Sequence, residues 1–316
     1  MFVLGIETSC DETAVSVVRN GNRICSNAVS SSLAFHKRYK GIIPEIASRL
    51  HVETIDSVLK DALTEAGVGL NQIKLIAVTS HPGLPGSLRV GMAFGRGLSF
   101  ALGVPLACIN HLHAHLYASF LNGRRRPRFP FIGLVVSGGH TSLFCVNSFF
   151  DIELIGSTQD DACGEAFDKV AAILGLGYPG GPAIEKLAKK GNPKSIEFRC
   201  SNTKQPLNFS FSGIKTAVLY RVSGKGQRAP GIADVAASFQ EVVIDTLIKK
   251  SILACKTRNI NRLVVGGGVA INNRLREKFT QQAKPNRINI YFSPKQLCGD
   301  NAAMIAGLGY RIRTAI

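Results

Sequence analysis

A nine-residue pattern that occurs twice, once near the start of each half of the chain, constrains the fold more than any other feature. The two copies read GIETSCDET (residues 5–13) and GLVVSGGHT (residues 133–141). In each copy Gly leads a short apolar segment, Ser and Thr follow at four-residue intervals, and a second apolar segment comes next. Such a pattern is typical of a β-hairpin whose tip gathers backbone N–H groups that can bind an anion. The repeat predicts two related halves; turn chemistry that recurs for local reasons is the alternative.

Strand-like and helix-like segments alternate in both halves, which predicts an α/β fold from a duplicated hairpin-led unit. In the first half we expect a helix over 42–66, strands at 75–79 and 104–109, and a buried, glycine-dotted helix from residue 88 that Ser87 caps. In the second half we expect strands at 153–155 and 262–265, helices over 161–174 and 182–190, and a closing helix from residue 302. The predicted lobes are 1–122 and 123–300, with inserted helices around 180–258, and a closing helix at 301–316 that returns to the first lobe.

The composition is that of an ordinary globular protein with room for two cores. Of 316 residues, 45% are hydrophobic and 19% are charged. Apolar stretches of membrane-spanning length are absent from the sequence, so no membrane association is expected. The eight cysteines are scattered without a Cys-x-x-Cys pair, which favours a reducing, cytoplasmic compartment over a disulfide framework or a zinc ribbon.

The positive charge is concentrated in the second part of the chain. The net charge is +17, and residues 121–316 carry 28 basic and 13 acidic side chains, against 10 and 8 in residues 1–120. The excess lies in Arg124, Arg125, Arg126 and Arg128 and in the spans 186–228 and 249–287. A one-sided positive surface suits a polyanion such as RNA, although basic residues also serve solubility. Low aromatic content, without Trp, argues against a base-stacking platform.

The segment His111-Leu112-His113-Ala114-His115 is the densest cluster of potential metal ligands. On a helix His111 and His115 lie on one face and can share a metal, whereas His113 points away. A zinc protease would need Glu where Leu112 stands, so that class lacks its base. Histidines satisfied by hydrogen bonds at a helix start are the alternative. Asp300 precedes a helix, and its residue type alone favours an N-capping role there.

Gly-rich and acidic segments in the second half are candidates for nucleotide contacts. Gly266, Gly267 and Gly268 lie between a strand and a helix, where a ring or phosphate could approach the backbone and Asn272 could bind a base edge or a sugar. The segment matches neither a P-loop nor a dinucleotide fingerprint. The acidic helix start at 160–168 either complements the helix dipole or supplies Asp168 or Glu165 to ribose hydroxyls.

Taken together, the motifs closely resemble the universal tRNA threonylcarbamoyladenosine synthase family of the bacterial TsaD type, formerly labelled glycoproteases. They occur in order over nearly the whole chain: GIETSCDET, PGLPGSLRVG, NHLHAH, VSGGHT, GEAFDK, YPGGP, FSFSGIKTA, GGGVAINNRLR and CGDNAAMIA. The resemblance implies a two-lobed fold of the actin, sugar kinase and Hsp70 class. It also implies transfer of a threonylcarbamoyl group from threonylcarbamoyl-AMP to the exocyclic amine of adenosine 37 in ANN-reading tRNAs.

The resemblance further implies a site. Its metal ligands are His111, His115 and Asp300, for one divalent ion, with iron expected and zinc or magnesium as alternatives. Its substrate-binding residues are Val135, Val136, Ser137, Gly138, Gly139, Asp168, Gly181, Glu185 and Asn272. The implied partners are tRNA, a TsaB-like paralogue and a TsaE-like ATPase. Three positions depart from the family pattern: His113 for Glu, which leaves metal identity open, His81 for Gly, and Glu185 for Asp.

The two hairpin tips differ in charge, which predicts different roles. The first, with Ser9, Asp11 and Glu12, is acidic and suits a cation and the substrate; the second, with its Gly-Gly, suits the adenylate phosphate. For a general base the candidates are His140, Glu12 and the carboxylate of the substrate. The competing functions are an ATP-dependent small-molecule kinase or carbamoyltransferase of the same fold, a metalloprotease, and a non-enzymatic RNA-binding protein.

Overall fold

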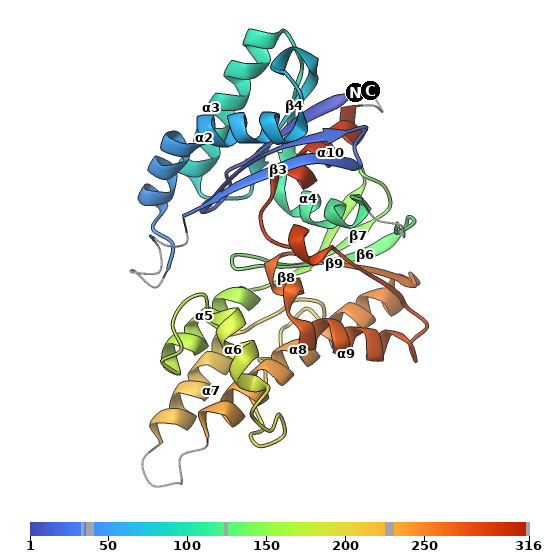
Figure 1. Ribbon diagram of the computed structural model, residues 1–316. Helices are drawn as coiled ribbons and strands as arrows, with labels where there is room; N and C mark the ends of the chain where they lie inside the picture. The colour runs from blue at the N-terminus through green and yellow to red at the C-terminus, as the bar shows by residue number, and fades with distance from the viewer. Residues whose placement is uncertain (33–34, 36–40, 123–125, 225–230, 314–316) are drawn as a thin grey trace. The chain divides into compact units, whose positions relative to one another are not determined.

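The chain folds into two compact units in the computed structural model, which describes residues 1–32, 35, 41–122, 126–224 and 231–313. Unit 1 comprises Met1–Pro127 and Ser293–Ile316, and unit 2 comprises Arg128–Phe292 (Figure 1). Arg124, Arg125 and residue 123, where the sequence predicts the first lobe limit, lie outside the described residues. The lobe limits therefore stay predictions.

Each unit contains one mixed sheet and the helices that cover it. The elements of unit 1 are β1 (Phe2–Glu7), β2 (Glu12–Arg19), β3 (Arg23–Ser31), α2 (Pro44–Ala66), η1 (Leu70–Gln72), β4 (Ile73–His81), α3 (Pro85–Leu102), β5 (Leu106–Asn110), α4 (His111–Tyr117), η2 (Ala118–Phe120), η4 (Lys295–Leu297) and α10 (Ala302–Arg313). Those of unit 2 are β6 (Phe131–Val136), β7 (Thr141–Val146), β8 (Ile152–Ser157), α5 (Cys163–Ile173), α6 (Gly180–Ala188), α7 (Ser212–Ser223), α8 (Ile232–Thr257), β9 (Arg262–Gly266), η3 (Gly268–Ile271), α9 (Asn273–Ala283) and β10 (Asn289–Phe292).

The two sheets have the same topology, which confirms the predicted duplication. Their strand orders are β3-β2-β1-β4-β5 and, read in the equivalent direction, β8-β7-β6-β9-β10. In both sheets the first three strands along the chain pair antiparallel in sequence order. The last two strands pair parallel, on the other side of the first strand. The central strands β1 and β6 are buried along nearly their whole length, so they are continuously apolar and not alternating.

In unit 1 the sheet packs between helices on both faces. Leu4 and Ile6 of β1 join a buried cluster with Ile55 and other side chains of α2. On the opposite face Gly5 lies against α10, where a Cβ at Gly5 would meet the backbone of Ala302. Helix α10, which follows unit 2 along the chain, is therefore held against β1. This packing also sets the position of the segment that leads into α10.

Helix α3 differs from its prediction at its start. The helix begins at Pro85 with Leu84 as N-cap, and Ser87 is buried inside the first turn, where its hydroxyl donates to the carbonyl of Cys10 at 3.2 Å. The expected cap at Ser87 is wrong because proline favours the first helical position, where its missing N–H costs nothing.

The expectation that α3 is buried is also wrong. Its buried residues are Ser87, Gly91 and Gly95, while Phe100 is 91% exposed. The two glycines bring the helix backbone close to unit 1's core, so that Met92, Phe94 and Leu98 pack against the core only in part and Phe100 points to solvent. Within the described ranges, no helix combines the length and the apolar character needed to cross a bilayer.

Candidate functional site

Three side chains of unit 1 converge on one point. His111 and His115 lie on successive turns of α4, as their i, i+4 spacing predicts, and Asp300 precedes α10. The two Nε2 atoms are 3.2 Å apart, and Asp300 Oδ1 is 3.5 Å from His111 Nε2 and 3.3 Å from His115 Nε2. Both histidines are buried. The three donor atoms thus form a nearly equilateral triangle.

The size and chemistry of this triangle fit a single metal ion. Ligand bonds of about 2.0–2.2 Å in a tetrahedral site place donor atoms about 3.3–3.6 Å apart. Two imidazole nitrogens and one carboxylate oxygen are common ligands of a catalytic ion, and they leave a coordination position for a substrate or water. Without a cation or a proton between them, these lone pairs would repel one another.

The helix that follows Asp300 is capped by its neighbour Asn301. The side-chain oxygen of Asn301 accepts a hydrogen bond from the N–H of Met304 at 3.1 Å. The capping role expected for Asp300 therefore belongs to Asn301, and the Asp300 carboxylate faces the two histidines.

A buried carboxylate orients one of the histidines. Glu7, at the end of β1, accepts hydrogen bonds at Oε2 from the Thr79 hydroxyl at 2.6 Å and from His111 Nδ1 at 2.9 Å, and at Oε1 from the Ser9 N–H at 2.5 Å. Because Nδ1–H of His111 donates to Glu7, Nε2 of the neutral ring carries the lone pair that points into the triangle.

The same carboxylates control the charge of the histidines. Burial disfavours the charged His111 ring, but Glu7 and Asp300 outweigh this effect and raise the pKa of His111 to about 9. Burial and the charge of His111 lower the pKa of His115. A proton on His111 therefore provides positive charge where an ion would sit.

The first hairpin tip lies beside this triangle. The Ser9 hydroxyl is 3.2 Å from His111 Nδ1, in addition to the bond of its N–H to Glu7. Burial, followed by the charges of Asp300 and Asp11, raises the pKa of Glu12 to about 8. Part of this rise reflects the negative charges of Asp300, Asp11 and Glu7 around the tip, and this environment favours a cation.

The second hairpin tip, in unit 2, combines fixed and open backbone. The Ser137 N–H donates to the His140 carbonyl at 2.8 Å, and the Ser137 carbonyl accepts from Gly164 at the start of α5 at 3.1 Å. Gly138 and Gly139 have open space in front of their Cα atoms. Val135 and Val136, by contrast, lie inside β6 with buried side chains. What the tip offers a ligand is therefore the backbone that follows β6.

The other predicted nucleotide residues lie on the helices that surround this tip. Asp168 of α5 accepts a hydrogen bond from the Gly180 N–H at 2.6 Å, which joins α5 to the start of α6. At Gly181 there is open space in front of the Cα atom. Asn272 caps α9 by accepting from Leu275 at 2.9 Å and donates to Gln240 at 2.8 Å. Its amide keeps a second N–H and a second oxygen lone pair beyond these two bonds.

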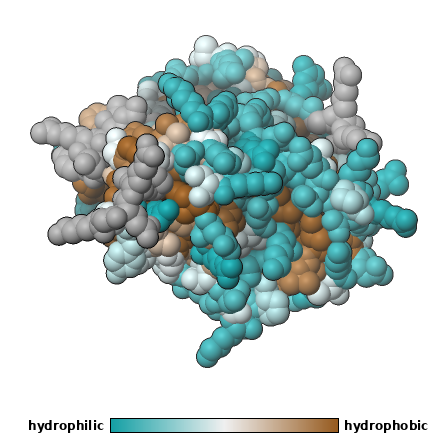
Figure 2. Space-filling view, turned by 90° about the horizontal axis from the view of Figure 1, so that it is seen from below, coloured by the Kyte–Doolittle hydropathy of each residue, from teal (hydrophilic) through white to brown (hydrophobic). Residues whose placement is uncertain are grey.

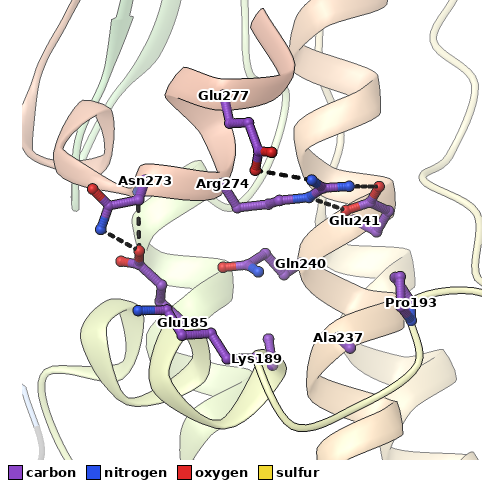
Figure 3. A pocket seen from close by; sticks show the side chains of 10 residues that line it. Glu185, Lys189, Pro193, Ala237, Gln240, Glu241, Asn273, Arg274 and Glu277 are labelled. Carbon is purple, nitrogen blue, oxygen red and sulfur yellow. Dashed lines mark hydrogen bonds and ion pairs between the residues drawn. The ribbon is translucent and has the colours of Figure 1, made fainter. Parts of the chain in front are cut away.

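A cavity of about 380 Å³ lies next to these residues, between α6, α8 and α9 (Figure 3). On one side Glu185 Oε1 accepts from the backbone N–H of Asn273 at 3.0 Å and from its side-chain amide at 2.7 Å. On the other side Arg274 is held by Glu241 at 2.8 and 3.0 Å and by Glu277 at 3.0 Å. The remaining lining residues are Ala188, Lys189, Pro193, Ala237 and Gln240.

The sequence analysis did not identify Glu7, Thr79 and Arg274. A signal was present for Glu7, because a carboxylate that ends a wholly apolar strand is buried and needs partners. Thr79 and Arg274 carry no comparable signal, since their partners are 72 residues away at Glu7 and 33 residues away at Glu241.

Comparisons with known proteins agree with the resemblance in the motifs. Residues 23–307 match the family model TsaD, described as tRNA N6-adenosine threonylcarbamoyltransferase. Relatives with that same description include those of Dictyoglomus turgidum, at 49% identity over 99% of this chain and 93% of the relative, and Clostridioides difficile, at 47% identity over 98% and 92%.

Solved structures with low sequence identity share the fold. HypF from T. kodakarensis superposes with a TM-score of 0.66 at 14% identity, over 99% of this chain and 48% of that one. The (R)-2-hydroxyglutaryl-CoA dehydratase component A of Acidaminococcus fermentans superposes with a TM-score of 0.58 at 15% identity, over 99% and 98%. The two-lobed, actin-like fold implied by the motifs is thereby confirmed. The chain belongs to the TsaD family of tRNA N6-adenosine threonylcarbamoyltransferases.

Proposed function

We propose that this chain transfers the threonylcarbamoyl group from threonylcarbamoyl-AMP to the exocyclic N6 amine of adenosine 37 in ANN-reading tRNAs. The observation that carries this function is family membership over nearly the full chain, with relatives at 46–49% identity that all carry the transferase name. The kinase, metalloprotease and non-enzymatic RNA-binding alternatives are not favoured by these matches. A tRNA substrate suits a cytoplasmic location.

The reaction exchanges one bond to the carbamoyl carbon for another. The N6 nitrogen forms a bond to this carbon, the bond from the carbon to the adenylate oxygen breaks, AMP leaves, and N6 loses a proton. An adenine amine is a poor nucleophile, so the mixed anhydride supplies the good leaving group. The protein contributes by positioning the donor and by stabilising negative charge on the departing phosphate.

In unit 2 the open backbone after β6 is suited to the adenylate. Gly138 and Gly139 would donate their N–H groups to the phosphate. Asp168, Gly181 and Glu185 would hold the ribose, and Asn272 the nucleotide. The cavity beside Glu185 would receive the purine ring, because the clamped guanidinium of Arg274 offers a flat cationic wall.

In unit 1 His111, His115 and Asp300 would hold one divalent ion. Iron is expected from the family, with zinc or magnesium as alternatives. A bound ion would supply Lewis-acid chemistry toward an oxygen of the substrate. Glu7 keeps His111 in the tautomer that can act as ligand, and Glu12 remains a candidate for accepting the N6 proton.

The basic surface of unit 2 would bind the tRNA through its phosphates. Lys186, Lys189, Lys190 and Lys194 are exposed on α6 and the segment that follows it. Figure 2 shows a largely hydrophilic face, with smaller apolar areas between the polar side chains. A TsaB-like paralogue and a TsaE-like ATPase are proposed as partners from the family resemblance.

The function is tested by incubating the full chain with the two partner proteins, threonylcarbamoyl-AMP and unmodified tRNA. Mass spectrometry of the digested tRNA measures N6-threonylcarbamoyladenosine. We expect product with the wild type and a loss of at least about 100-fold with the double variant His111→Ala/His115→Ala. His113→Ala, on the same helix but outside the donor triangle, is the control and should keep most of the activity.

Two results would refute separate parts of the proposal. Phosphate transfer to a small molecule, without any modified tRNA when all partners are present, would refute the transfer reaction. Equal product formation by the wild type and the double variant would leave the transfer reaction standing and refute the role of His111 and His115 in it.

A further inference from the structure

A third buried histidine of unit 1 lies outside the donor triangle and contacts the first hairpin tip. His51 belongs to α2 and is only 1% exposed. Its Nδ1 is 2.7 Å from the Thr13 hydroxyl, and its Nε2 is 3.0 Å from the Cys10 carbonyl oxygen. One ring therefore spans the turn between β1 and β2, from residue 10 to residue 13.

The chemistry of these partners fixes the tautomer of the ring. A carbonyl oxygen can only accept, so Nε2 of His51 carries a proton and donates to Cys10. Burial lowers the pKa of His51, which keeps the ring neutral and leaves Nδ1 as the acceptor for the Thr13 hydroxyl. Both ring nitrogens are thus used, in opposite senses, on opposite sides of the turn.

The neighbouring carbonyls of the turn are held as well. The Ser9 carbonyl accepts from the Leu84 N–H at 2.8 Å, and the Asp11 carbonyl accepts from the Ser32 hydroxyl at 2.6 Å. Ser87 adds a second, longer bond to the Cys10 carbonyl. Such complete use of backbone acceptors gives the turn one conformation and leaves its side chains at defined positions.

Two of those side chains belong to the surroundings of the donor triangle. Ser9 bonds through its N–H to Glu7, which orients His111, and its hydroxyl is 3.2 Å from His111 Nδ1. The charge of Asp300 acts on Glu12. A displaced turn would therefore alter the charge and the hydrogen bonds around the proposed metal ligands.

We propose that His51 is a positioning residue, which holds the β1–β2 turn, and with it Ser9 and Glu12, beside the metal ligands. This inference rests on the proposed function, because it assigns His51 a role in keeping that site in its working geometry. His51 does not touch the ion or the substrate in this role.

Three substitutions distinguish the contributions of the two hydrogen bonds that the His51 ring makes. His51→Ala removes both. The amide of His51→Gln reaches the place of Nε2 and keeps a donor for the Cys10 carbonyl, whereas His51→Asn places its polar atoms near Nδ1 and keeps only the contact to Thr13. Ile55→Ala, one turn further along α2 and also buried, is the matched control, because it weakens the core without touching the turn.

The measurements are Co²⁺ binding to the full chain by its visible absorption, kcat and KM for tRNA with the partners present, and the melting temperature. For His51→Ala we expect Co²⁺ affinity and kcat to fall about tenfold, with KM for tRNA unchanged. Tenfold is about the smallest loss seen when a partner of a metal ligand is removed. His51→Gln should stay within about threefold of the wild type, and His51→Asn should resemble the alanine variant. Ile55→Ala should melt at a lower temperature with wild-type Co²⁺ affinity.

The inference is overturned if folded His51→Ala keeps wild-type affinity and kcat, if His51→Gln loses as much as His51→Ala, or if Ile55→Ala loses affinity in proportion to its stability. The last result would show that His51 acts through stability alone. A wild type that neither binds Co²⁺ nor modifies tRNA would overturn the proposed function together with this inference, whereas an active wild type with an unaffected alanine variant overturns this inference only.

Discussion

Replacing Glu7 with Gln exchanges one carboxylate oxygen for an NH₂ group. The change in size is small, but it should weaken metal binding. If the amide oxygen of Gln takes the place of Oε2, its NH₂ group faces the Ser9 N–H, and two buried donors oppose each other. If the oxygen takes the place of Oε1, the NH₂ group faces His111 Nδ1 and moves the His111 proton to Nε2. That proton would then point at the place of the metal.

The magnitude follows from these two choices. Leaving a buried donor unpaired costs about 1–3 kcal/mol, which should appear in the free energy of unfolding. Loss of an outer-shell partner of a ligand histidine lowers metal affinity about 10–100-fold. This range corresponds to about 1.4–2.7 kcal/mol of binding free energy.

The assay is calorimetric titration of the full chain with Zn²⁺, together with urea unfolding of the same samples. Thr79→Val is the control, because it removes one hydrogen bond to the same carboxylate but keeps the charge of Glu7 and its bond to His111. It should lose stability and keep metal affinity. The reasoning fails if folded Glu7→Gln binds Zn²⁺ like the wild type, or if Thr79→Val loses as much affinity.

Further predictions concern the stability of both units and tRNA binding. Burial opposes ionisation of Asp160, but hydrogen bonds from the start of α7 lower its pKa. Because the pKa is lower in the folded than in the unfolded state, the ionised carboxylate stabilises the fold, and this stabilisation should be lost as pH falls below about 4. Urea unfolding at pH 7 and pH 3 should therefore show a smaller pH dependence for Asp160→Asn than for the wild type. Gly5→Ala should lower the free energy of unfolding by about 1–3 kcal/mol, because its Cβ meets α10, whereas Gly97→Ala, exposed inside α3 with open space, should raise it by about 0.5–1 kcal/mol. The double variant Lys190→Glu/Lys194→Glu should raise KM for tRNA with kcat unchanged and reduce the slope of log affinity against log salt by about 1.5, as measured by tRNA binding at several salt concentrations.

Local sequence patterns predict the fold well where the segments that pair are close in sequence. The two hairpins follow from apolar segments joined by small polar turns, and their equivalence predicts the common topology of the sheets. The exposure of α3 was not predictable from its apolar content, because Phe100 adds hydrophobicity but points to solvent, and other apolar side chains of the helix are buried only in part. Its start follows from Pro85, because proline favours the first helical position.

The site was less predictable from the sequence where its parts lie further apart along the chain. His111 and His115 are related by one helical turn, so the spacing alone brings them together. Asp300 reaches them through the packing of α10 on Gly5, which no local pattern shows, and only the family resemblance indicated its role. Whether Asp300 or Asn301 caps α10 depends on where the helix begins to within one residue. Sequence patterns do not locate helix ends that closely.

Metal dependence of the transfer reaction tests the central claim most directly. The full chain is stripped with a chelator, combined with its partners, threonylcarbamoyl-AMP and unmodified tRNA, and given increasing equivalents of Fe²⁺ under anaerobic conditions or of Zn²⁺. If His111, His115 and Asp300 hold the ion that the reaction needs, N6-threonylcarbamoyladenosine formation should rise with added metal and saturate at one equivalent per chain, and His111→Ala/His115→Ala should not respond. Full activity of the stripped chain, or the same metal response in the double variant, would contradict this claim.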